Sequence, residues 1–140
     1  MRVHFPFRTS HLAVGLFGLL AFVLTGQYMH HVRGHLHGMA DGPRLLYRTS
    51  HIYLMWASLP NLLLGLYLQP PASGRPARLL WQTGSVLLLA APVWIVLSFF
   101  LETRHPDLHR PLCRIGIETA FAGALMHGAA QWLARRHRPI

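Results

Sequence analysis

The sequence lacks lysine altogether and has one cysteine and only four acidic residues in 140. The single cysteine, Cys113, excludes an internal disulfide bond and a metal cage built from thiolates. Charged residues make up 12% of the chain, against 52% hydrophobic residues, which is well below the charge content of a soluble domain. No nucleophile–base pair, phosphate-binding loop or catalytic metal motif is present, so we expect no intrinsic enzyme activity.

All 13 basic residues are arginines, and the formal net charge is +9. In a soluble protein this charge would favour binding to nucleic acid. Here the arginines stand at the ends of long apolar runs, where their side chains can reach lipid phosphates. We therefore expect a lipid bilayer as the partner, and no nucleic acid.

Four apolar runs account for the hydrophobic residues, at 12–28, 52–68, 79–101 and 115–133. Each is close to the ~20 residues that a helix needs to cross a bilayer. No small-x-small cleavage site follows the first run, so we expect it to stay as a helix and not to be a signal peptide. The sequence predicts an all-α integral membrane protein. We expect one transmembrane domain over residues 1–140, an antiparallel four-helix bundle with helices at about 9–28, 49–68, 79–101 and 115–134.

Four crossings would place both termini on the same side of the membrane. Seven arginines would then lie on the terminal side and six on the other side. By the positive-inside rule this bias places both termini in the cytoplasm. We expect a multi-pass protein of the bacterial inner membrane.

The sequence Arg-Thr-Ser-His occurs twice, at 8–11 and 48–51, each time just before an apolar run. Ionisable groups inside a membrane usually have a function. An equally weighted alternative is a helix entrance, with an interfacial arginine, an N-cap hydroxyl and a histidine at headgroup level. Because successive helices are antiparallel, the two copies would lie at opposite faces of the membrane.

One face of each of three expected helices includes small residues, which let helices approach closely. On the first helix this face consists of His11, Gly15, Gly18, Phe22 and Thr25, and on the second it consists of His51, Met55, Ser58, Leu62 and Gly65. On the fourth helix the stripe is Gly116, Ala120, Ala124 and Gly128, with His127 on the same side.

Two of these histidines, His11 and His127, are expected at similar depth on the terminal side. Neighbouring first and fourth helices would bring them together as axial ligands of one b-type haem, with Arg8 beside His11. His51, preceded by Arg48, is the next candidate ligand. It shares its level with His30 or His31 and with Glu118, which allows a second site on the other side.

The first helix resembles membrane cytochromes b of the b561 type, including the di-haem subunits of hydrogenases and formate dehydrogenases. In that family an arginine shortly before a histidine opens a helix that ends in Thr-Gly, and the matching residues are Arg8, His11, Thr25 and Gly26. Leu12 stands where the family often has tryptophan. The resemblance implies haem b, electron transfer, and quinone or other membrane-protein subunits as partners. The overall layout is also similar to small uncharacterised four-helix proteins of the bacterial inner membrane.

Two other functions remain open. Four histidines between the first two helices could bind copper, nickel or zinc through neutral imidazoles: His30, His31, His35 and His37. The simpler interpretation, which we favour, is a solvated loop with incidental histidines, followed by a turn at Asp41-Gly42-Pro43. Alternatively, the chain could be a structural subunit of a larger membrane complex without a cofactor, as the small-residue stripe would suit.

Overall fold

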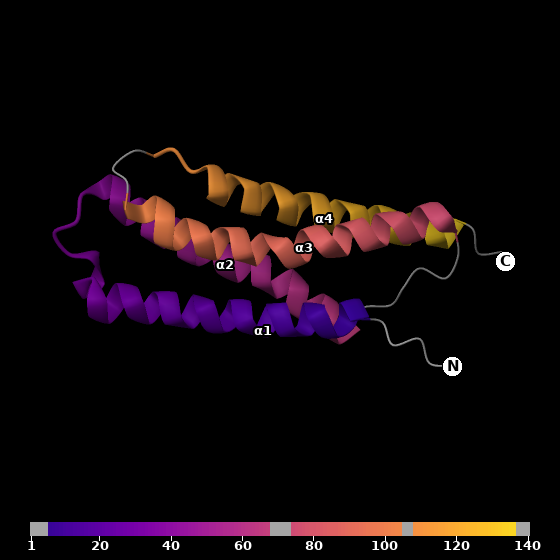
Figure 1. Cartoon of the computed structure of the whole chain (residues 1–140), viewed down its shortest axis with the longest axis horizontal. Helices are drawn as coiled ribbons and strands as arrows, with labels where there is room; N and C mark the ends of the chain where they lie inside the picture. Colours follow the sequence, from indigo (N-terminus) through magenta and orange to yellow (C-terminus); the bar gives the residue numbers. More distant parts are fainter. Residues whose placement is uncertain (1–5, 68–73, 105–107, 137–140) are drawn as a thin grey trace.

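The computed structural model describes residues 6–67, 74–104 and 108–136, which are almost entirely helical and contain no strand. The four long helices are α1 (Pro6–Gln27), α2 (Asp41–Tyr67), α3 (Arg75–Leu101) and α4 (Pro111–Arg136). A π-helical turn (Tyr28–Val32) and a 3₁₀ turn (Gly34–Leu36) follow α1, and another 3₁₀ turn (Glu102–Arg104) follows α3. The expected all-α class is confirmed. Successive helices run in opposite directions (Figure 1), so the start of α1 and the end of α4 share one end of the bundle, here called the terminal end.

All four long helices have a proline in their first turn, and α2 begins well before its apolar run. α2 begins at Asp41 and not near residue 49, because Asp41-Gly42-Pro43 forms its first turn and not the expected loop. Proline is tolerated there, since the backbone N–H that it lacks has no helical partner. Both Arg-Thr-Ser-His copies therefore lie inside helices. The interpretation of their hydroxyls as N-caps is wrong.

The bundle consists of two tight helical hairpins, α1–α2 and α3–α4, which meet mainly along α2 and α3. In the first hairpin, a methyl group on Gly15 would lie 2.5 Å from the backbone nitrogen of Leu62. A methyl group on Gly65 would lie 2.4 Å from the backbone of Leu12. Both distances are too short for any side chain, so glycine allows the two backbones to approach. The faces expected on the first two helices do form this contact.

In the second hairpin the close approach involves different residues from those expected. Gly116 packs against Ile95, and a methyl group on Gly123 would lie 2.8 Å from the carbonyl oxygen of Gly84. Ala124 and Gly128, by contrast, are exposed. A spacing of four residues drifts by about 40° per step around a helix, so the contact face moves from Gly116 to positions 123, 127 and 130. The predicted stripe is therefore right at its start and wrong at its end.

The core mixes apolar residues such as Leu54, Ile95 and Phe99 with many polar ones, and the surface exposes many large apolar side chains. The core contains buried polar side chains from every helix: His11, Thr25, Ser50, Ser58, Asn61, Ser85, Ser98, Glu102 and His127. The outer surface carries large apolar side chains such as Phe17 (71% exposed), Phe121 (68%) and Leu125 (72%). Two segments, Phe7–Val32 and Arg75–Arg104, are long and apolar enough to cross a membrane.

The backbone contact at Gly65 predicts an unusual response to a small substitution. Alanine normally favours a helix by about 1 kcal/mol over glycine. At Gly65 the added methyl group must separate α1 from α2, so Gly65→Ala should lower the thermal midpoint of unfolding in detergent, as followed by circular dichroism. Gly128→Ala is the matched control, because nothing lies within 4 Å of its added methyl group. Equal midpoints for the two variants would contradict the close packing of this hairpin.

Candidate functional site

The most constrained polar contact joins α1 to α2 and α3 near the terminal end. His11 has no exposed surface, and its Nδ1 lies 2.6 Å from Oδ1 of Asn61. The amide nitrogen of Asn61 donates to the backbone oxygens of Ala57, at 3.0 Å, and Leu88, at 2.7 Å. Because two carbonyl oxygens occupy its amide hydrogens, Asn61 can present only its oxygen to His11.

This contact fixes the tautomer of His11. A ring nitrogen that faces an amide oxygen must carry the proton, so Nδ1 is the donor. In the neutral ring Nε2 then has a lone pair, and it is buried without a hydrogen-bond partner among the described residues. Leaving a buried acceptor unpaired costs about 1–3 kcal/mol. Metal-ligating histidines are held in the same way, with one nitrogen donating to the protein and the other free.

His127 of α4 lies beside His11, and the two are here called the imidazole pair. Their ring centroids are 6.2 Å apart and their planes are inclined at 75°. Nε2 of His127 is 3.1 Å from the hydroxyl oxygen of Ser85 on α3. Gly84 leaves room for the ring, because a methyl group there would lie 3.0 Å from Cδ2 of His127. The structure thus brings together the two histidines that the sequence singled out.

Arg8 does not face the imidazole pair. Its Nε donates to the carbonyl oxygen of Gly65 at 3.2 Å, and its Nη2 donates to that of Leu66 at 3.1 Å. These carbonyls belong to the last turn of α2, where no helical N–H remains to satisfy them. Arg8 therefore caps α2, a structural role that accounts for its position.

The second copy of the motif has a different environment. The ring of His51 stacks on Phe22, with centroids 4.1 Å apart, and its Nδ1 lies 2.9 Å from the hydroxyl oxygen of Thr25. The Thr25 hydroxyl donates to the carbonyl oxygen of Phe22, so it accepts the His51 proton. Glu118 is exposed on α4 and pairs with Arg114 at 2.6 Å. The second site expected from His51, His30 or His31, and Glu118 is not assembled among the described residues.

Sequence reasoning missed a buried carboxylate that joins α3 to α4. Glu102 accepts hydrogen bonds from the backbone N–H groups of Leu112, at 2.5 Å, and Cys113, at 3.2 Å, and from the hydroxyl of Ser98. It therefore places a negative charge at the N-terminus of α4, where the helix dipole favours it. A lone acidic residue at the end of an apolar run was the available signal.

Arg110 extends these contacts to α2. Its guanidinium donates to the hydroxyls of Thr49 and Ser50, each at 2.5 Å. The hydroxyl oxygens of Ser50 and Ser98 are 3.4 Å apart. The hydroxyls of the second Arg-Thr-Ser-His copy thus anchor the start of α4, whereas Arg48 remains exposed.

The four loop histidines cluster at the opposite end from the imidazole pair. Ring centroids are 3.8 Å apart for His30 and His35, 4.3 Å for His30 and His31, and 5.8 Å for His35 and His37. In the described part of the chain, no three histidine, cysteine or acidic side chains form a group that could hold a metal ion. A cavity of about 220 Å³ does adjoin His30, His35 and Arg48.

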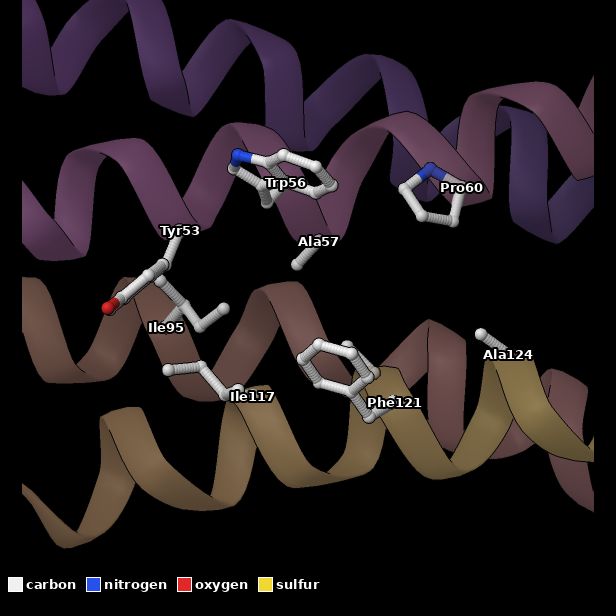
Figure 2. Close-up of a pocket in the computed structure, with 9 residues that line it drawn as sticks. Tyr53, Trp56, Ala57, Pro60, Ile95, Ile117, Phe121 and Ala124 are labelled. Atoms are coloured by element: carbon white, nitrogen blue, oxygen red, sulfur yellow. The ribbon is translucent and has the colours of Figure 1, made fainter.

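A larger cavity of about 370 Å³ lies between α2 and α4, over α3. Figure 2 shows its apolar lining, including Trp56 and Pro60 of α2, Ile95 of α3 and Phe121 of α4. It offers shape but almost no polar group to orient a ligand.

Comparison of the chain with protein-family models, curated proteins and solved structures gave no match. Its function must therefore be inferred from the geometry of the chain itself.

The tautomer of His11 can be measured directly. In protein free of added metal or cofactor, ¹⁵N NMR of labelled histidine should show His11 neutral, with its proton on Nδ1; His11→Asn identifies the signal. Asn61→Leu removes the acceptor and should mix the two tautomers, whereas Ser58→Ala should leave the signal unchanged. A proton on Nε2 in the unaltered protein would refute the assignment.

Glu102 and Glu118 should contribute very differently to the free energy of unfolding. Glu102→Ala removes three charge-assisted hydrogen bonds and should lower the free energy of unfolding by about 2 kcal/mol or more. Glu118→Ala removes an exposed pair on the same helix and should change it by less than about 0.5 kcal/mol. Denaturant titration in detergent compares the two. A similar loss for both variants would show that Glu102 does not hold α4 in place.

Proposed function

We propose that this chain is a multi-pass membrane protein that holds one b-type haem between His11 and His127. Support for the membrane comes from the large apolar side chains on the surface and from two segments long and apolar enough to cross a bilayer. Exposed side chains such as Phe17, Phe121 and Leu125 would form a large unfavourable surface in water, whereas lipid covers them without cost. The same arrangement lets the buried polar groups bond to one another where no water is available.

The lone pair on Nε2 of His11 is the observation on which the haem proposal rests. Its proton is directed to Asn61, its other nitrogen is buried without a partner among the described residues, and a second imidazole lies beside the ring. A bare zinc ion would need about four ligands, and two are present. A haem iron already has four porphyrin nitrogens and needs only two axial ligands. The number of imidazoles therefore favours haem over a bare ion at this site.

The spacing of the rings is compatible with that assignment. Two metal–nitrogen bonds of about 2 Å plus half the width of each ring add up to about 6 Å. The ring centroids of His11 and His127 are 6.2 Å apart. Ligation through Nε2 of His127 would replace the contact with Ser85, and a neutral hydrogen bond of that kind contributes only about 1 kcal/mol.

Room for the macrocycle has to come from the division between the hairpins. Neither of the two cavities described above is lined by His11 or His127. The two histidines belong to different hairpins, however, and contact between α1 and α4 is sparse. Loading would open the sparse contact between α1 and α4 beside the two rings and leave the glycine contacts within each hairpin intact.

A bound haem would supply one-electron transfer. The partners would then be quinone or other membrane-protein subunits, and the location would be the bacterial inner membrane with both termini in the cytoplasm. Within this proposal, Asn61 holds the His11 ring in the tautomer that can bind iron, and Ser85 and Gly84 position His127.

Purification tests this function. The protein should stay with the membrane after an alkaline wash and be released by detergent. After haem supplementation, its reduced-minus-oxidised spectrum should show the α-band of a b-type cytochrome. His11→Ala and His127→Ala should each abolish that band or shift it, whereas His51→Ala and His109→Ala should retain it. Absence of the band in the unaltered protein would leave a membrane subunit without haem.

A further inference from the structure

An open cavity lies where the end of α1, the turns after it and the first part of α2 meet. Its volume is about 220 Å³, and its lining includes His30, His35 and Arg48. All three side chains are exposed, and no carboxylate of the described residues lines the cavity. The residue after His35, Leu36, is buried against Phe99 of α3 and so holds this turn on the bundle. The cavity therefore presents a guanidinium and two imidazoles to its surroundings.

The charge of Arg48 has no counterpart in the described part of the chain. Arg48 makes no hydrogen bond, ion pair or cation–π contact with a described residue. Other arginines at this end are paired, Arg44 with Asp41 at 3.4 Å and Arg114 with Glu118 at 2.6 Å. The remaining described acid is the buried carboxylate that accepts from the start of α4. An anion is thus the ligand that suits the cavity, and phosphate oxygens accept readily from guanidinium and imidazole N–H groups.

The position of the cavity along the bundle indicates the source of that anion. The apolar segment Phe7–Val32 ends beside it, and His30 lies two residues before that end, which is the level of lipid phosphates in a bilayer. Ile52 and Leu59 are exposed and follow Arg48 by four and eleven residues, within about 40° of it around α2. The rise from Arg48 to Leu59 is about 16 Å, close to half of a ~30 Å hydrocarbon core. An acyl chain can therefore follow α2 from a phosphate held in the cavity.

We propose that this cavity binds the phosphate of one anionic phospholipid, with Arg48, His30 and His35 donating to its oxygens. A phosphodiester carries one negative charge, which the Arg48 guanidinium balances, and the imidazoles add hydrogen bonds. An ammonium on the headgroup would be repelled by Arg48 and would find no described carboxylate in the cavity. The site therefore favours phosphatidylglycerol over phosphatidylethanolamine. The proposal rests on the membrane location proposed above and not on the haem, whose ligands lie at the opposite end of the bundle.

Native mass spectrometry of the full chain, released from a non-ionic detergent, tests the headgroup preference. Phosphatidylglycerol and phosphatidylethanolamine with the same acyl chains are offered at equal concentration. The unaltered protein should retain one molecule of phosphatidylglycerol in several-fold preference. Arg48→Gln should weaken its retention about fivefold, the contribution of one arginine beside an anionic lipid. Arg104→Gln is the matched control and should keep the preference, because Arg104 is exposed at the same end but does not line the cavity.

A second pair of variants tests the imidazoles. His30→Asn combined with His35→Asn should lower the retention of phosphatidylglycerol. The control, His31→Asn combined with His37→Asn, removes two exposed imidazoles of the same segment but none from the cavity, and it should bind as the unaltered protein does. Circular dichroism melting checks that each variant is folded. An excess of inorganic phosphate distinguishes a lipid from a free anion, and it should not displace phosphatidylglycerol because the acyl chains also contribute to binding.

Four results would overturn the site: equal retention of the two lipids, equal losses for Arg48→Gln and Arg104→Gln, equal losses for the two double variants, or displacement of the lipid by inorganic phosphate. Resistance to an alkaline wash and the haem spectrum are measured separately. A protein that stays in the membrane without preferring either headgroup would therefore refute this site and leave the proposed function standing.

Discussion

The structure depends on one constraint: each polar group turned into the bundle must find its partner inside the bundle. Asn61 shows how this is met, because one side chain satisfies carbonyl oxygens on α2 and α3 and orients an imidazole on α1. The Glu102 carboxylate likewise accepts hydrogen bonds from the first backbone N–H groups of α4. In water each such contact contributes little to stability. Where water is excluded, breaking it would leave a buried polar group without a partner, which is costly. The polar contacts thus set the register of the helices.

Among these buried polar side chains, His11 differs because one of its ring nitrogens has no hydrogen-bond partner among the described residues. Its Nδ1 donates to Asn61, its Nε2 has no partner among the described residues, and the ring of His127 lies beside it. His51 has a similar tautomer, set by Thr25, but its ring is covered by Phe22 and faces no described imidazole. The two copies of Arg-Thr-Ser-His are therefore alike in sequence and unlike in role. Their histidines, His11 and His51, differ in their depth in the bundle and in the helix that lies beside each of them.

The sequence predicted the four helices and the small-residue faces of α1 and α2, because periodicity follows from helix geometry alone. It also placed His11 and His127 at matching depth, but the expected neighbouring of the first and fourth helices is wrong, since α1 and α4 are scarcely in contact. It did not predict where α2 begins, since Asp41-Gly42-Pro43 is compatible with either a turn or a first helical turn. It also missed Asn61 and Glu102 as partners. Their roles depend on which carbonyl or N–H lies opposite, and only three-dimensional packing determines that.

The division into two glycine-packed hairpins has a consequence for how the chain would be inserted into a bilayer. Most polar contacts close within a hairpin: Arg8 with the end of α2, Thr25 with His51, Ser85 with His127, and Glu102 with the start of α4. Each hairpin is thus a largely self-satisfied unit, which under the proposed membrane location would allow the hairpins to insert one after the other. Only a few contacts, such as Asn61 with Leu88 and Arg110 with Thr49, must await the meeting of the halves.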